Sequence, residues 1–349
     1  MDTIINTENT LRQRYQRFKS KNPKVRIREA ANNLEVSEAE LLATSIGEGV
    51  VRLEGNWPDF ILQCRDLGRV LVLTRSEGCV LEHKGNFQKI SIHGKAPNQV
   101  ATVIGPIEQR IFFGQWKFGF AAEIQGARGP MKSFQFFDKA GEAIMKIYLL
   151  KESNLDVFEQ LKNEYKAIDQ TAQLEIEEIA FPEYAKSIDQ VAFTTDWEEM
   201  KDTHDFFGML KKHRLHRLDA LKNIGEKWAY QVDRLVVREI LEAASERQLP
   251  IMIFAGNRGN IQIHQGKVKT LKQIDNWFNV MDPDFVMHLN EDTIDSAWVV
   301  HKNTTDGLVS SLELYDKSGE LIAQYFGLRK PGIPQNITWK QLVDRLPRV

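Results

Sequence analysis

The sequence predicts an α+β protein made by tandem duplication, in which each half is a large antiparallel β-sheet with helices packed on one face. Two segments align without gaps, SFQFFDKAGE (133–142) and SLELYDKSGE (311–320), and half of their positions are identical. A second pair, EGCVLEHKG (77–85) and RGNIQIHQG (258–266), matches at nearly the same spacing. A period of about 180 residues is far longer than a solenoid repeat, so it indicates two copies of one domain.

Short stretches with alternating apolar and polar residues predict the strands, and the D-K-small-G segment shared by the first aligned pair predicts a β-hairpin turn in each copy. In both copies, segments with helical periodicity come before the strands. Because no helix separates successive strands, we expect an antiparallel sheet. The expected strands include residues 69–75, 89–94, 110–124, 251–256, 296–302 and 310–315, and the expected helices are 25–34, 37–46, 196–212 and 217–225.

These elements divide the chain into an N-terminal repeat at residues 1–150, a linker at 151–194 and a C-terminal repeat at 195–349. The linker begins as a charged helix and continues as an acidic stretch with a proline, which is typical of a solvated connector. We expect no chemistry there.

The composition excludes several classes of protein. A chain of 349 residues, 42% of them hydrophobic, can bury two cores, and its net charge of −2 gives no overall field that would attract nucleic acid or an anionic membrane. Residues 27–47 resemble a helix-turn-helix, but the second helix carries no lysine or arginine, so we expect no specific nucleic-acid partner.

The chain also lacks the marks of export. Its first residues do not form a signal peptide, and no apolar run is long enough to span a bilayer. Cys64 and Cys79 lack C-x-x-C spacing, which fits a reducing compartment. We therefore expect a cytoplasmic protein in which both cysteines are ordinary buried residues.

His204, in the stretch KDTHDFFGML (201–210), is either a buried core residue or a ligand. Trp197, Met200, His204 and Phe207 have the spacing of one apolar stripe on a continuous helix, so the pattern by itself favours a buried histidine bonded to a backbone carbonyl. The alternative is a ligand of haem, which needs a single axial imidazole. The first copy has no histidine before His83, and this difference between the copies favours a functional role.

The basic run KKHRLHR (211–217) allows two interpretations. Lys211, Lys212 and Arg214 suit a solvated helix end, which also complements the helix dipole. His213 and His216 could bind a metal together, although an H-x-x-H pair in a polar segment is a weak signal.

Four runs, DTHDFFGMLKKHRLHRLDAL, QRIFFGQW, MDPDFVMHLNEDTIDSAWVVHK and AQYFGLRKPG, resemble the cytoplasmic haemin-degrading or haemin-transport factors of Gram-negative haem-uptake systems. The similarity covers nearly the whole chain, including its duplication. It implies an intracellular haem-binding protein of an iron-acquisition pathway, with haem b as substrate or cargo.

The resemblance also implies the residues of the site. His204 would be the axial ligand of the haem iron, and Arg110 would reach over the other haem face as the distal catalytic group. Packing and polar contacts to haem would come from Phe112, Arg217, Lys302, Gln324, Phe326 and Arg329.

From the residues alone, these contacts have structural alternatives. Lys302 and Arg329 could be surface charges, and Gln324 could be a polar residue on an edge strand. Phe326 stands where the family often carries tyrosine, so a ring can still pack on the macrocycle but the phenol's hydrogen bond is lost.

Two functions remain open. In the first, the protein degrades haem with electrons from an external donor, a reductase or a small reductant, because the sequence has no flavin or nicotinamide motif. In the second, it is a carrier that passes haem from an inner-membrane transporter to a separate haem oxygenase.

Overall fold

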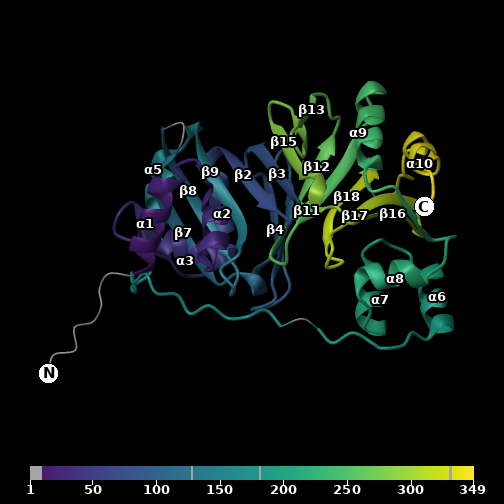
Figure 1. The fold of residues 1–349 in the computed structure, drawn as a ribbon, viewed down its shortest axis with the longest axis horizontal. Helices are drawn as coiled ribbons and strands as arrows, with labels where there is room; N and C mark the ends of the chain where they lie inside the picture. The colour runs from purple at the N-terminus through teal and green to yellow at the C-terminus, as the bar shows by residue number, and fades with distance from the viewer. Residues whose placement is uncertain (1–9, 127–128, 181, 330–331) are drawn as a thin grey trace. The chain divides into compact units, whose positions relative to one another are not determined.

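The computed structural model describes residues 10–126, 129–180, 182–329 and 332–349. The chain forms two compact units that interleave in sequence (Figure 1). The first unit takes in residues 1–73, 84–180 and 258–260, and the second takes in 74–83, 181–257 and 261–349. The predicted α+β fold is confirmed, with antiparallel strand ladders in both units.

In the first unit, five antiparallel strands pair in the order β1, β7, β8, β9, β2, and three more pair in the order β4, β5, β6. The strands are β1 (Val50–Leu53), β2 (Gly68–Arg75), β4 (Lys89–His93), β5 (Val100–Ile104), β6 (Gln109–Phe112), β7 (Phe118–Gly126), β8 (Gly129–Phe137) and β9 (Ala143–Ser153). The helices are α1 (Leu11–Lys21), α2 (Ile27–Leu34), α3 (Glu38–Ala43), α4 (Trp57–Gln63) and α5 (Leu155–Glu164).

The second unit repeats this plan, with strands in the order β10, β16, β17, β18, β11, β12 and a second group in the order β3, β15, β14, β13. The strands are β3 (Cys79–Gly85), β10 (Ala229–Val232), β11 (Ile251–Gly256), β12 (Asn260–Gly266), β13 (Leu271–Ile274), β14 (Trp277–Met281), β15 (Phe285–Asn290), β16 (Ser296–Lys302), β17 (Val309–Tyr315) and β18 (Leu321–Gly327). The helices are α6 (Gln190–Glu198), α7 (Asp205–His213), α8 (Arg217–Asn223), α9 (Val236–Glu246) and α10 (Ile337–Val343).

The two aligned hairpins have the same turn, which confirms the repeat at atomic detail. Oδ1 of Asp138 and Oδ1 of Asp316 each accept the backbone N–H groups of the residues two and four positions further along, at 2.8–3.0 Å. Gly141 and Gly319 then take positive φ angles of 76° and 82°, a conformation that favours glycine.

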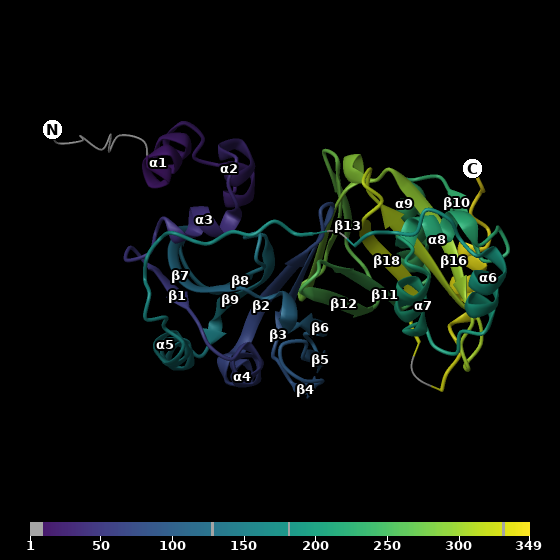
Figure 2. The same ribbon diagram turned by 90° about the horizontal axis from the view of Figure 1, so that it is seen from below.

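Helices cover both faces of the main strands in each unit, not one face as the sequence suggested. In the first unit, α1, α2 and α3 lie on one side of β7, β8 and β9, and α4 and α5 lie on the other (Figure 2). In the second unit, the core on one face contains α9 and α10, and the core on the other face contains α6, α7 and α8 (Figure 1). Successive side chains of a strand point to opposite faces, so each strand contributes to both cores.

One predicted helix and one predicted strand are interrupted. Residues 196–212 form the end of α6 and most of α7, separated by residues 199–204. Asp205 explains the break, because its Oδ2 accepts the backbone N–H groups of Lys201 and Asp202 at 3.0 and 2.9 Å and so competes with helical hydrogen bonding. Residues 110–124 are divided between β6 and β7 by a short 3₁₀ turn at Phe113–Gln115.

The segment predicted as a linker begins inside the first unit. Phe158 and Leu161 of α5 are fully buried in that unit's core, so this helix is not a solvated connector. Cys64 and Cys79 are fully buried, as expected. None of the helices in the described ranges is both long and apolar enough to cross a membrane.

Candidate functional site

His204 lies at the start of α7, as the residue just before its first turn, and its side chain is 89% exposed. The interpretation of a buried core histidine is therefore wrong. Nδ1 of His204 is 2.5 Å from Oδ1 of Asp202, which also accepts the backbone N–H of His204 at 2.9 Å. If Nδ1 carries the proton of this hydrogen bond, Nε2 keeps its lone pair for an external ligand.

Two residues without polar side chains, Phe207 and Gly208, lie on the exposed side of α7 close to His204 in sequence. Phe207 is 77% exposed, which is unusual for a large aromatic side chain. A Cβ atom added to Gly208 would meet no heavy atom within 4 Å, so open space lies over the helix at this point. An exposed imidazole with an exposed aromatic ring and open space on the same helix is suited to a planar ligand with a central metal.

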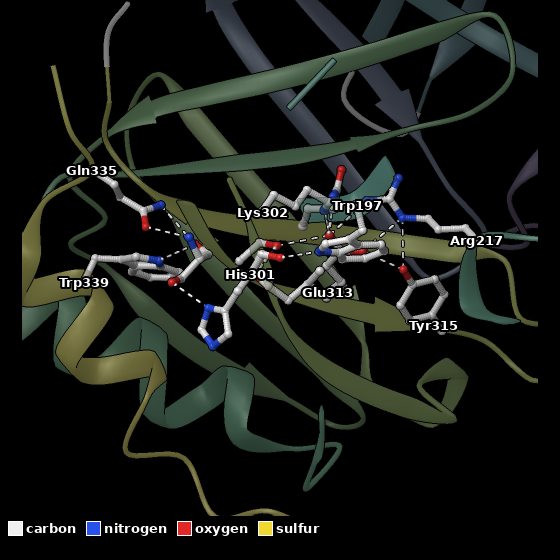
Figure 3. A network of polar contacts seen from close by, with 12 residues as sticks. Trp197, Arg217, His301, Lys302, Glu313, Tyr315, Gln335 and Trp339 are labelled. Atoms are coloured by element: carbon white, nitrogen blue, oxygen red, sulfur yellow. Dashed lines mark hydrogen bonds and ion pairs between the residues drawn. The ribbon is translucent and has the colours of Figure 1, made fainter. Parts of the chain in front are cut away.

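A buried ion cluster joins α8 to the strands β16 and β17 of the second unit (Figure 3). Glu313 of β17 is fully buried and accepts hydrogen bonds from the guanidinium of Arg217 at 2.9 and 3.0 Å and from Nζ of Lys302 at 2.9 Å. The carboxylate also accepts from Ser311, Tyr315 and Gln324. Burial opposes ionisation of Glu313, but the charges of Arg217 and Lys302 hold its pKa well below its usual range.

This cluster contains two cations for one anion, so it carries an excess positive charge. Burial lowers the pKa of Lys302 to about 8, against the opposing effect of Glu313. Phe206 covers both cations, with Nζ of Lys302 at 4.3 Å and the Arg217 guanidinium carbon at 4.8 Å from its ring centroid. Phe206 follows His204 by two residues, so the start of α7 carries the exposed histidine and, on its buried side, the ring that covers the two cations.

The structure excludes two of the alternatives to haem contact that the residues alone allowed. Lys302 is only 3% exposed, so it is not a surface charge. Gln324 is not on an edge strand, because β18 pairs with both β17 and β11.

Arg329 and Phe326 complete the expected contacts within the second unit. Arg329 is half-buried, and its Nη1 has no hydrogen-bond partner in the described part of the chain. The pKa of Asp202 is lower than its ordinary value. Burial alone would raise this pKa, but the hydrogen bonds from His204 and the charge of Arg329 outweigh that effect. Phe326 is half-buried and packs edge-on against Phe254.

Arg110 and Phe112 belong to the first unit, where they lie half-buried on β6. Nη1 of Arg110 donates to the backbone oxygen of Gln109 at 3.0 Å, and Nη2 is 3.5 Å from the carboxylate of Glu108. Their position over a haem bound at His204 stays a prediction.

His213 and His216 have separate partners and do not form a metal pair. Nε2 of His213 is 2.5 Å from Asp196, whereas Nε2 of His216 is 3.6 Å from Glu320. Among the described residues, no group of three or more histidine, cysteine, aspartate or glutamate side chains could hold a metal ion.

Sequence reasoning missed Asp202, Phe206 and Glu313. A signal for Glu313 was present in the repeat, because a carboxylate occupies an otherwise buried strand where the first copy has Gln135. The D-x-H spacing of Asp202 and His204 was a second signal, since an aspartate two residues before a histidine can accept its ring proton.

Comparison with known proteins then identifies the family. The family model described as the haemin-degrading HemS/ChuX domain matches residues 35–165 and, a second time, residues 214–346. The chain belongs to this haemin-degrading family. The two matches correspond to the two copies inferred from the internal repeat.

Members of the HemS/ChuX family match this chain over nearly its full length. The hemin transport protein HmuS of Yersinia pestis is 32% identical over 340 residues, which is 97% of each chain. The crystal structure of holo-PhuS, a heme-binding protein from Pseudomonas aeruginosa, has a TM-score of 0.93 at 40% identity and covers 97% of this chain and 99% of its own. The heme degrading enzyme ChuS of Escherichia coli O157:H7 has a TM-score of 0.90 at 30% identity, with 95% and 97% covered.

Proposed function

We propose that this protein binds haem b in the cytoplasm, with Nε2 of His204 as the axial ligand of the iron. The observation that carries the proposal is the exposed His204, which has its Nδ1 held by Asp202 and shares its helix with the exposed Phe207 and the open space over Gly208. The match to holo-PhuS, a heme-binding protein, supports haem as the ligand.

Residues of the second unit suit each part of the haem molecule. Phe207 and Phe326 offer rings to the macrocycle. The propionates need cations, and the half-buried Arg217 and Arg329 are candidates for direct contact. Lys302 is buried on Glu313, so it acts on the propionates mainly through its charge.

We further propose that the protein degrades haem, with Arg110 as the distal group and electrons from an external reductase or small reductant. Bound haem supplies the iron that activates dioxygen. A guanidinium stays protonated near neutral pH, so Arg110 can donate hydrogen bonds on the distal side but cannot act as a base. The similarity to ChuS, a heme degrading enzyme, favours this function.

The second candidate is a carrier that receives haem from an inner-membrane transporter and delivers it to a separate oxygenase. The similarity to HmuS, a hemin transport protein, favours this alternative. The same axial ligand and the same cations would serve both functions.

Haem titration followed at the Soret band tests the site. We expect His204→Ala to change the ligation of the iron and to weaken binding, and Arg110→Ala to leave the axial ligation intact while altering the distal face. Unchanged spectra and affinity in both variants would rule out the assignment.

Single-turnover spectroscopy separates degradation from transport. The haem complex is mixed with a reductant in air, and catalase removes free peroxide. Degradation predicts loss of the Soret band in the wild type and slower loss in Arg110→Ala. An intact haem spectrum over the same time would assign the protein to the carrier class.

A further inference from the structure

The segment that presents His204 is fixed by hydrogen bonds on both sides. Asp205 accepts the backbone N–H groups of Lys201 and Asp202, and the backbone N–H of Thr305 donates to the oxygen of Lys201 at 2.8 Å. Asp202 therefore sits on an ordered turn and does not depend on His204 for its position.

Asp202 holds His204 at two points with a single oxygen. Its Oδ1 accepts the backbone N–H of His204 at 2.9 Å and lies 2.5 Å from Nδ1 of the same residue. The backbone contact fixes the distance between the two residues, and the ring contact then fixes the rotation of the imidazole. The side chain of Asp202 is half exposed, whereas the imidazole is almost fully exposed and has no packing to orient it.

We infer that Asp202 is a positioning residue for the haem ligand, which selects the His204 tautomer with the proton on Nδ1 and makes Nε2 a stronger donor to iron. This inference rests on the proposed function. A carboxylate behind a ligating histidine fixes the ring and raises the basicity of the bound nitrogen. In this role Asp202 acts on haem only through His204.

The test compares Asp202→Asn and Asp202→Ala with wild type in the ferrous haem complex. Asp316→Asn is the matched control, because Asp316 also caps backbone N–H groups of a turn but has no histidine partner within the described ranges. Resonance Raman spectroscopy reports the iron–histidine stretch, and haem titration reports affinity.

We expect both Asp202 variants to lower the iron–histidine stretching frequency and to weaken haem binding by about 10- to 100-fold, the usual effect of removing such a partner. Asp316→Asn should change neither quantity. A wild-type frequency and affinity in both Asp202 variants would overturn the inference.

The same experiment separates this inference from the proposed function. If His204→Ala keeps the wild-type band, the ligand is another residue and both proposals fail. If His204→Ala loses the band while the Asp202 variants keep it at the wild-type frequency, only the positioning role fails.

A measurement on the haem-free wild type keeps the inference testable even if the variants do not fold. Nitrogen-15 NMR of the histidine side chains distinguishes the two neutral imidazole tautomers. We expect the neutral form of His204 to carry its proton on Nδ1. A proton on Nε2 would contradict the inference without any substitution.

Discussion

Each unit buries an ion cluster between its helical layer and its sheet, but the two clusters have opposite polarity. In the first unit, the helix residue is an acid, Glu38 of α3, which pairs with Lys146 of β9. In the second unit, the helix residue is a base, Arg217 of α8, which pairs with Glu313 of β17. Glu38 and Arg217 each occupy the fourth position of the segment that matches the family model.

The difference between the clusters is that two copies of one fold hold different charges at the same place in their cores. The first pair is balanced, with one acid and one base. The second has an extra cation, Lys302, on the same carboxylate, and it lies beneath the segment that carries His204. The shared location reflects the duplicated core, whereas the excess charge occurs in the unit that carries the exposed His204.

Removing the anion of the second cluster should have the largest effect on stability. Glu313→Gln leaves the buried Lys302 and the half-buried Arg217 facing each other without their acid, and breaking a buried ion pair costs about 3–5 kcal/mol. Glu38→Gln removes the acid that faces a single base, Lys146, so its cost should be smaller. Urea unfolding measures the free energy of unfolding of both variants. A larger decrease in Glu38→Gln than in Glu313→Gln would contradict the expectation that the cluster with two cations depends more on its acid.

The second prediction concerns a position where the two copies agree. His83 and His264 occupy the same place in the second aligned pair of segments, and their rings stack in the second unit. Burial, with a contribution from the charge of His264, lowers the pKa of His83 to about 3. Burial lowers the pKa of His264 to about 4, against the opposing effect of Asp282.

These two histidines should make the protein sensitive to acid. The unfolded chain takes up protons below about pH 6.5 that the folded chain does not, so stability is present above that pH and is lost as the pH falls toward 4. Each histidine contributes a slope of at most about 1.4 kcal/mol per pH unit. Denaturant midpoints between pH 7.5 and 5 should fall less steeply in His264→Gln, while the exposed His93→Gln should behave as wild type.

The third prediction concerns a variant in which the second cluster keeps one acid and one base, as the first pair does. Lys302→Met leaves Glu313 paired with Arg217, so we expect a small change in stability. Haem affinity should fall, because the positive charge that Lys302 adds to the cluster is lost. Lys146→Met is the matched control, since it should destabilise the first unit by leaving Glu38 unpaired without weakening haem binding. Equal haem affinity in Lys302→Met and wild type would contradict a role for the excess charge.

The features that could be predicted from the sequence were those that depend on residues close together in the chain. The repeat, both hairpins and most strands follow from local alternation and turn residues such as Asp138 and Gly141. The break before α7 was missed because the apolar spacing of Trp197 and His204 continues through it, while the capping by Asp205 depends on side-chain geometry.

The ion cluster could not be predicted because it depends on contacts between distant residues. Arg217 and Glu313 lie 96 residues apart in sequence, and only the folded sheet brings them within 3.0 Å. The family resemblance pointed to Arg217, Lys302 and Gln324, but it did not reveal that Glu313 holds all three.

Chemical rescue at His204 is the most direct test of the central claim, that the second unit holds haem iron through this residue. His204→Gly removes the imidazole from a side-chain position that is open to solvent. We predict that this variant loses the wild-type Soret spectrum and recovers it when free imidazole is added, while His93→Gly, an exposed histidine of the first unit, keeps the wild-type spectrum throughout. A wild-type spectrum in His204→Gly without imidazole would contradict the claim.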